Sequence, residues 1–364
     1  MERDQVLAFR VARHGLATRR PLTLAEAAAC PASDYARGRA LLALAARADG
    51  VTREAYDRAT DAGELVLGPS LRAAIHAQAP RDFALFGQAL LASDDAELAD
   101  QIGPAFKRHL RDAGGTAGEV LTEVAEATQA ALADGRALDR TQLHAELRER
   151  VRPELLPWCK GCASHHVSPM LWRFAGVRAG MRCDAGRRFL LARRRGTTPG
   201  PAEAARRYLR FYGPATPKDL GAWAGIARSH ARRLWTEIED ELIEVHVEDR
   251  RAWLLAADEA DLASPPQAEG VRLLPPRDPY VQAPDRATLV PDPVLRKRLF
   301  RPIADPGAIL QDGRLAGLWR TRAKGKRLQI EVEEFERLDR DALQAEADRI
   351  AAVREARTAE VHLG

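Results

Sequence analysis

The order of elements between residues 202 and 255 restricts the fold more than any other feature of this sequence. An apolar helical run opens the segment, Thr216-Pro217 is typical of a helix start, and Gly225 is typical of a helix stop. Residues 229–241 predict the next helix, and the alternating residues after it predict two strands. Helix, turn, helix and hairpin is the order of a winged helix-turn-helix unit, whose second helix commonly enters the DNA major groove.

The same order is predicted twice more, nearer the N-terminus. Residues 37–46 and 53–61 predict helices, followed by two short strands on either side of a turn at 68–69. Residues 116–133 predict an amphipathic helix with a capping box, and a later hairpin turns at 184–186. Tandem winged helices also serve as scaffolds or protein-binding modules, so the element order alone does not establish contact with DNA.

A proline-rich stretch at 264–284 marks a junction, after which strand-like runs and an amphipathic helix at 341–357 predict a small barrel or sheet. The fold class is therefore α+β and mostly helical, with three tandem winged helix-turn-helix units and a small C-terminal β-barrel. The expected parts are residues 1–115, 116–200, 201–264 and 265–364.

Composition agrees with a nucleic-acid partner without establishing one. The chain has 56 Lys+Arg against 52 Asp+Glu, a net charge of +4, and 50 of its basic residues are arginines. Arginine suits planar phosphate contacts, although GC-rich genomes also enrich it. No run approaches the roughly 18 apolar residues of a membrane span, and no export signal is present, so we expect a cytoplasmic protein. No phosphate-binding glycine loop or Gly-x-Ser-x-Gly elbow occurs, so any chemistry is expected to be hydrolytic and cofactor-free.

Cys159-x-x-Cys162 followed by His165-His166 has the residue types of a zinc box. No second ligand pair follows at zinc-finger spacing, and four ligands within eight residues would strain a tetrahedral site. We therefore expect no metal here, and we expect all four cysteines to be reduced thiols. Trp158 and the two cysteines would then belong to the core.

Five strings together resemble the winged-helix DNA glycosylase family. They are residues 40–47 (ALLALAAR), 70–76 (SLRAAIH), 157–166 (PWCKGCASHH), 273–279 (LLPPRDP) and 317–320 (GLWR), with 157–166 the most specific. The resemblance implies three winged helices in a C-shape around duplex DNA, closed by the β-barrel. It also implies cofactor-free, metal-free, monofunctional hydrolysis of the N-glycosidic bond of bulky alkylated purines, including some interstrand crosslinks.

The family's catalytic signature is Gln-x-Gln or Gln-x-Asp just before the apolar helix that here begins at Ala40. In this sequence the triplet is Ser33-Asp34-Tyr35, so both glutamine positions differ. An N7-alkylated purine leaves readily, so the enzyme mostly stabilises an oxocarbenium-like sugar and orients a water, and a carboxylate suits both tasks.

We expect Asp34 to supply that carboxylate, with Ser33 and Tyr35 hydrogen-bonding the water or a phosphate. Ser33 or Asp34 could equally cap the following helix, and the two roles do not exclude each other. A third alternative is a family member that has lost catalysis and kept DNA binding.

Candidate DNA contacts come from several places. The resemblance makes 157–166 the start of an inserted helix in the second unit. Arg72 and His76, four apart on an expected strand, are candidate phosphate ligands, or else a surface arginine and a half-buried histidine. Arg187 and Arg188 add a basic patch, which is often only a solvated face. The full set of expected DNA-binding residues is Arg37, Arg72, His76, Lys160, Ser164, His165, His166, Arg228, Ser229, His230, Arg232, Lys324 and Lys326.

Two functions remain in competition. The first is a monomeric DNA glycosylase for bulky alkyl-purine adducts in duplex DNA, serving repair or self-resistance to a genotoxic natural product. The second is a non-catalytic winged-helix DNA-binding protein, a regulator or damage sensor, which would usually dimerise to read paired half-sites.

Overall fold

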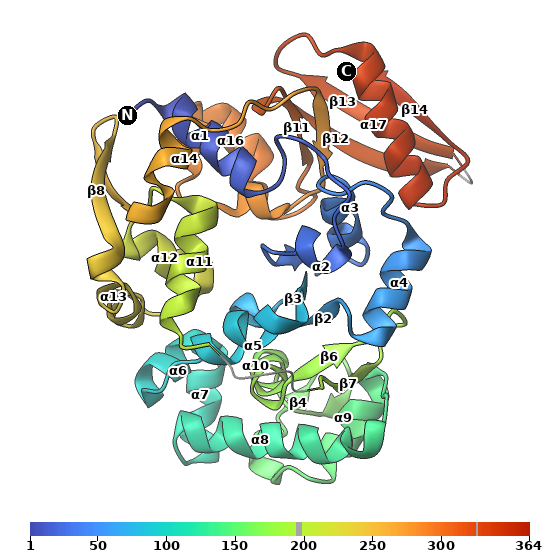
Figure 1. The fold of residues 1–364 in the computed structure, drawn as a ribbon. Coiled ribbons are helices and arrows are strands. Elements are labelled where there is room, and N and C mark those ends of the chain that lie inside the picture. The colour runs from blue at the N-terminus through green and yellow to red at the C-terminus, as the bar shows by residue number, and fades with distance from the viewer. Residues whose placement is uncertain (194–198, 325–326) are drawn as a thin grey trace.

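The computed structural model describes residues 1–193, 199–324 and 327–364 (Figure 1). Before residue 115 the chain forms helices α1 (Arg3–Arg13), α2 (Leu24–Ala27), α3 (Arg39–Ala45), α4 (Arg53–Ala62), α5 (Phe83–Phe86), α6 (Asp95–Ile102) and α7 (Pro104–Ala113), with strands β1 (Ala32–Ser33), β2 (Val66–Pro69) and β3 (Ile75–Gln78). The helices expected at 37–46 and 53–61 are confirmed as α3 and α4.

The turn expected at 68–69 is wrong, because β2 continues through Gly68 and Pro69 and the chain reverses over residues 70–74. Gly68 serves close packing instead. A Cβ atom there would lie 2.9 Å from the Met181 carbonyl oxygen and 3.0 Å from the Phe83 ring. The glycine at position 68 therefore reflects a close contact with other segments of the chain, and not a turn.

The next segment forms α8 (Ala117–Ala131), α9 (Arg140–Arg148), β4 (Trp158–Cys159), β5 (Ser164–His165), α10 (Pro169–Ala179), β6 (Met181–Cys183) and β7 (Phe189–Leu191). The expected capping box is present: the Glu119 amide donates to Thr116 Oγ1 at 3.2 Å, and the Thr116 amide donates to Glu119 Oε2 at 2.8 Å. Residues 157–166 were expected to start a helix, and this is corrected: they form the β4–β5 hairpin ahead of α10.

One antiparallel sheet joins these two segments. Its strand order is β1-β3-β2-β6-β7, and Leu67 of β2 pairs with Cys183 of β6. The loop after β1 therefore lies close to the β6–β7 turn, which comes about 150 residues later in the chain.

The third segment forms α11 (Ala202–Tyr212), α12 (Pro217–Ala224), α13 (Arg228–Thr236), β8 (Leu242–Val247), β9 (Arg250–Leu255) and α14 (Glu259–Ala263). Thr216 and Asp219 cap α12 reciprocally, and Gly225 ends it with a φ of +71°, as the sequence predicts. Helix α1 packs here as well, because Val6 and Phe9 share a buried cluster with residues of β8, β9 and α14.

The C-terminal segment forms β10 (Val271–Leu274), α15 (Arg286–Leu289), α16 (Pro293–Leu299), β11 (Gly307–Gln311), β12 (Arg314–Lys324), β13 (Arg327–Glu334), α17 (Arg340–Val353) and β14 (Thr358–Leu363). Its sheet has the open order β10-β11-β12-β13-β14, so the expected barrel is instead a curled half-barrel, with α17 packed against one face (Figure 1). The sequence did not indicate β10 or β14. Strand β14 pairs with β13 in parallel after crossing through α17.

Buried ion pairs hold the N-terminal and C-terminal segments together. Arg47 and Asp278 lie 2.7 Å apart, with 4% and 0% of their side chains exposed. Arg19 pairs with Glu346 at 2.8 Å in the same way. Arg47 follows α3, and Arg19 also donates to the Ala45 carbonyl at its end, so these contacts fix the end of α3 against the C-terminal segment. Within the described ranges, no helix combines the length and the apolar character needed to cross a membrane.

Candidate active site and nucleic-acid interface

Asp34 lies in the loop that joins β1 to α3, and only 1% of it is exposed. Its amide donates to the Ile75 carbonyl at 2.8 Å, which ties the loop to β3. Its Oδ1 accepts a hydrogen bond from the Ala40 amide at 2.8 Å, in the first turn of α3. Asp34 therefore makes the helix-capping contact that the sequence allowed.

The other carboxylate oxygen of Asp34 is held by Arg187, from the β6–β7 turn. The guanidinium forms an ion pair with Oδ2, and the same Nη2 donates to the Asp34 carbonyl at 2.9 Å. Only 20% of the Arg187 side chain is exposed. Arg187 was expected only in a basic patch. Its contact with Asp34 was not predicted, because nothing in the local sequence relates two residues 153 positions apart.

Burial is the main influence on the Asp34 carboxyl group. Desolvation raises its pKa above the ordinary value of 3.8, while the Arg187 charge and the amides of Ala40 and Gly38 pull the pKa down. Burial has the larger effect. Asp34 is thus a carboxylate whose charge depends on its neighbours, which is common at reaction centres and also in structural ion pairs.

The side chains of the two residues beside Asp34 have different surroundings. Ser33 belongs to β1 and stands opposite His76 in the sheet. Tyr35 is 65% exposed, and the Arg173 guanidinium lies 5.7 Å from its ring centroid. The triplet therefore does not converge on one point.

Tyr35 and Arg187 share a cavity of about 340 Å³. Arg37, Arg140, Trp172, Arg173 and Phe189 are also in its wall. Because Arg187 lines this cavity and also pairs with Asp34, the carboxylate lies directly behind the cavity wall. Aromatic faces and arginines in one wall suit a nucleotide, which offers both a ring to stack on and a phosphate.

Residues 36–39, from the same loop and the start of α3, line a second cavity of about 410 Å³. Five arginines line it: Arg37, Arg39, Arg53, Arg320 and Arg354. Asp305 is the one acidic residue among the described lining residues, and it already pairs with Arg39 at 3.3 Å and with Arg277 at 3.0 Å. Burial, and then the charge of Arg53, lowers the pKa of Arg354. The cavity therefore carries excess positive charge.

Arg72 and His76 do not share a strand, which corrects the expectation. Arg72 sits in a one-turn 3-10 helix with a φ of +54° and donates to the Trp223 carbonyl at 3.0 Å. His76 is 3% exposed, and its Nδ1 donates to the Ala74 carbonyl at 2.9 Å. Burial, together with the Arg72 charge, lowers the pKa of His76 to about 4. Arg72 connects the first and third segments, and His76 is a neutral buried side chain away from the surface.

The start of α13 is divided between surface and interior. Arg228 and Arg232 are exposed, while His230 is 7% exposed. Ser229 bonds to Glu97 of α6, and Arg233 pairs with the same carboxylate. Hydrogen bonds from Arg233 and Ser229 lower the pKa of Glu97 to about 2. Arg228 and Arg232 are therefore the α13 side chains free to meet DNA.

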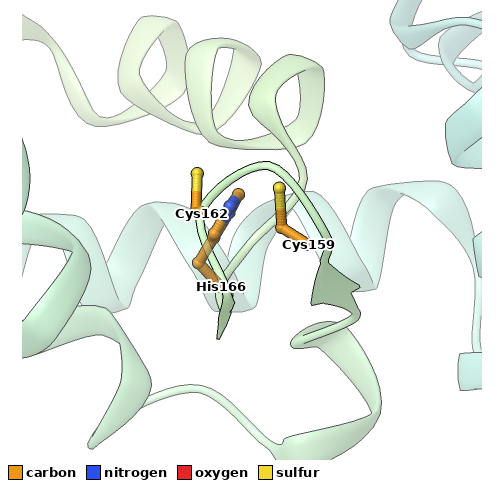
Figure 2. A group of neighbouring side chains, drawn as sticks. All are labelled: Cys159, Cys162 and His166. Atoms are coloured by element: carbon orange, nitrogen blue, oxygen red, sulfur yellow. The ribbon is translucent and has the colours of Figure 1, made fainter.

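The DNA-binding residues expected in the β4–β5 hairpin also differ in exposure. Lys160 and His165 are exposed and Ser164 is half-buried, whereas His166 is 6% exposed and faces Cys159 and Cys162 (Figure 2). The expectation that Trp158, Cys159 and Cys162 belong to the core is wrong. Trp158 is 55% exposed, Cys162 is exposed and Cys159 is half-buried. Lys326 and the Lys324 side chain lie outside the described residues.

Together, the fold and the site define an α+β protein in which the loop that carries a buried carboxylate lines two cavities, one partly aromatic and one strongly basic. The family model described as "DNA glycosylase AlkZ-like" matches residues 32–353. This chain therefore belongs to the AlkZ-like DNA glycosylase family, and the family resemblance expected from the sequence is confirmed.

Two comparisons with individual proteins agree. An interstrand DNA cross-link repair glycosylase from Streptomyces sahachiroi is 33% identical over 136 residues, which are 34% of this chain and 36% of that protein. The alignment thus spans about a third of the curated relative's length. The solved structure of Streptomyces sahachiroi DNA glycosylase AlkZ superposes with a TM-score of 0.77 at 24% identity, covering 99% of this chain and 98% of that one. This structural likeness establishes a shared fold.

Proposed function

We propose that this protein is a monomeric DNA glycosylase that hydrolyses the N-glycosidic bond of bulky alkylated purines, including N7-guanine adducts and interstrand crosslinks, in duplex DNA. Such an activity serves DNA repair or self-resistance to a genotoxic natural product. The observation that carries the proposal is the position of Asp34. A buried, arginine-paired carboxylate stands at the middle position of the triplet that corresponds to the family's catalytic signature. Its loop lines both a cavity suited to a nucleotide and a cavity suited to a phosphate.

Hydrolysis of the N-glycosidic bond of an N7-alkylated purine needs little more than one well-placed carboxylate. An N7-alkylated purine already carries a positive charge, so the bond to the sugar breaks readily and leaves an oxocarbenium-like centre. A carboxylate close to that centre stabilises the developing charge and orients the attacking water. The ion pair with Arg187 favours the ionised form of Asp34, which both roles require.

We further propose that DNA itself uncovers the carboxylate. Arg187 covers Oδ2 of Asp34. A phosphodiester entering the 340 Å³ cavity offers Arg187 a second anion, and a small shift toward it opens Oδ2 on the side of the sugar. The guanidinium charge stays beside Asp34 and keeps the carboxylate ionised. Tyr35, with its exposed ring in the same cavity, then contacts the phosphate or the water.

Binding of the DNA backbone falls to the arginines. Arg37, Arg53, Arg320 and Arg354 meet a phosphate in the 410 Å³ cavity. We propose that the segments 1–115, 116–200 and 201–264 act as winged helix-turn-helix units around the duplex, with Arg228 and Arg232 of α13 contacting a further phosphate.

The test is release of free modified base from duplex carrying N7-methylguanine or a bulky N7 adduct. We expect wild type to release the bulky base and Asp34→Asn to lose that activity, because asparagine keeps the capping contact and lacks the charge. Asp339→Asn is the matched control, since Asp339 caps α17 through its carboxylate and lines neither cavity. Full activity of Asp34→Asn would exclude the proposed role of the carboxylate.

One observation favours the second candidate, a non-catalytic DNA-binding protein. Both oxygens of Asp34 are already engaged, as they would be in a purely structural residue. That function predicts tight, salt-sensitive binding to undamaged duplex and no base release from either adduct. The same experiment therefore separates the two functions.

A further inference from the structure

Three potential metal ligands meet in the β4–β5 hairpin. Cys159, Cys162 and His166 each direct one ligand atom into a common space, and these atoms all lie within 4.8 Å of one another (Figure 2). Both thiols are free. Cys162 is exposed and Cys159 half-buried, so an ion can enter from solvent. Cys30 and Cys183, by contrast, are buried in the core.

The orientation of His166 points to a ligand. Its Nδ1 lies 2.7 Å from the Val167 carbonyl oxygen, which can only accept, so Nδ1 carries the hydrogen and Nε2 presents a lone pair. That Nε2 is buried and has no hydrogen-bond partner among the residues that the structure describes. A metal-binding histidine is commonly held in this way, with one nitrogen on a backbone carbonyl and the other on the ion.

His165, the other candidate in the sequence motif, turns away. Its Nδ1 donates to the Leu156 carbonyl at 2.7 Å, and its ring lies 5.2 Å from the Trp158 ring. No metal was expected here because four ligands within eight residues would strain a tetrahedral site. The hairpin supplies three and leaves one position open, which removes the expected strain.

We propose that Cys159, Cys162 and His166 bind one Zn²⁺ ion, with water in the fourth position. Two thiolates and an imidazole are soft and borderline ligands that favour zinc over magnesium or calcium. Zinc bonds of about 2.1 to 2.3 Å place the corners of a tetrahedron about 3.6 Å apart, so the hairpin closes by about 1 Å at most on binding.

The ion would position the hairpin and the start of α10, and it would take no part in bond cleavage. The hairpin leads directly into α10, whose Trp172 and Arg173 line the 340 Å³ cavity. Closing the hairpin around zinc fixes the start of this helix and holds Lys160 and His165 on the surface. The site is independent of the proposed glycosylase activity, and a non-catalytic DNA-binding protein would carry it equally.

The test is cobalt and zinc binding by the full-length protein, after chelation under reducing conditions and a thiol assay that confirms reduced cysteines. We expect about one Co²⁺ per chain, with a thiolate charge-transfer band and the strong visible absorption of a tetrahedral ion, displaced by Zn²⁺. Cys162→Ser should weaken the band, and Cys159→Ser/Cys162→Ser should abolish it. His166→Gln should lower the affinity at least about 100-fold.

His165→Gln is the matched control, because it changes the neighbouring histidine that does not face the cysteines, and it should bind cobalt as wild type does. Cys162 is exposed, so Cys162→Ser is expected to fold even if a change at the buried His166 does not. Absence of the band in reduced wild type, or equal binding by the double cysteine variant, would overturn the proposal. So would a loss in His165→Gln as large as that in His166→Gln.

Discussion

Burial and the charge of Arg187 have opposite effects on the pKa of the Asp34 carboxyl group, and burial has the larger one. The folded-state pKa of Asp34 lies above its ordinary 3.8, so the folded protein holds this proton more tightly than the unfolded chain does. The contribution of Asp34 to stability therefore falls as the pH rises through the folded-state pKa. Arg187 limits that loss, because its charge opposes the effect of burial.

Replacing Arg187 should leave the effect of burial on Asp34 without the opposing charge. We expect Arg187→Gln to lower the free energy of unfolding by about 3 kcal/mol at pH 7, because the buried Asp34 carboxylate loses its partner. The pKa of Asp34 then rises further, so Asp34 takes up a proton more readily and the deficit shrinks toward pH 5. The acid limb of base release should move to higher pH for the same reason.

Urea denaturation at both pH values measures the effect. Arg188→Gln is the control, because Arg188 comes from the same turn and its partner, Asp184, does not line either cavity. An equal deficit for Arg187→Gln at pH 5 and pH 7 would contradict the electrostatic account.

At the scale of elements, the contact between β11 and β12 depends on a residue without a side chain. The Trp319 Nε1 group donates to the Leu274 carbonyl of β10 at 2.7 Å, across Gly307. A Cβ atom at Gly307 would lie 2.2 Å from that nitrogen and 2.4 Å from that oxygen. Three strands of the half-barrel therefore meet where only glycine fits.

Gly307→Ala should break this arrangement. We expect a loss of about 2 kcal/mol or more in the free energy of unfolding, because the indole must move and its hydrogen bond is lost in the core. Thermal or urea unfolding measures it. Gly200→Ala should be neutral by comparison, since a Cβ there meets no atom within 4 Å. A neutral Gly307→Ala would mean that β11 shifts freely against its neighbours.

The elements that the sequence predicted well are those whose signals are local. The caps at Thr116 and Thr216 satisfy amides three residues away, so each helix start can be identified without the rest of the chain. The features missed depend on distant partners. The 157–166 hairpin is an exception, because its two strands pair with each other. Gly68, by contrast, packs against Met181 in a distant part of the chain. For the same reason the sequence indicated Asp34 as a candidate and did not indicate its ion-pair partner, Arg187.

At the scale of the whole molecule, the arginines around the 410 Å³ cavity come from opposite ends of the chain. Arg53 lies on α4, and Arg354 is the residue that ends α17. Arg354 donates to Thr321 at 2.8 Å, which keeps its charge beside the cavity. Buried ion pairs such as Arg47–Asp278 hold the two ends in register. A preformed cluster of like charges is costly for the protein alone, and a phosphate relieves the repulsion.

This arrangement makes a quantitative prediction about DNA binding. Each phosphate contact releases counterions, so the logarithm of the affinity falls linearly with the logarithm of salt concentration, by about 0.9 per phosphate. We expect Arg53→Gln and Arg354→Gln each to weaken duplex binding and to reduce that slope by about one. The double variant should reduce the slope by little more than either single variant, because both arginines serve the same phosphate.

The matched control is Arg58→Gln on the same helix. Arg58 is exposed and pairs with Glu54 at 2.9 Å, away from the cavity, so its replacement should leave the slope unchanged. Titrations of a fluorescent duplex at several salt concentrations give the slopes directly. Equal slopes for all variants would remove the 410 Å³ cavity from the DNA interface. A decrease for Arg58→Gln as large as that for Arg53→Gln would show that the net charge of α4, and not the cavity, attracts the DNA.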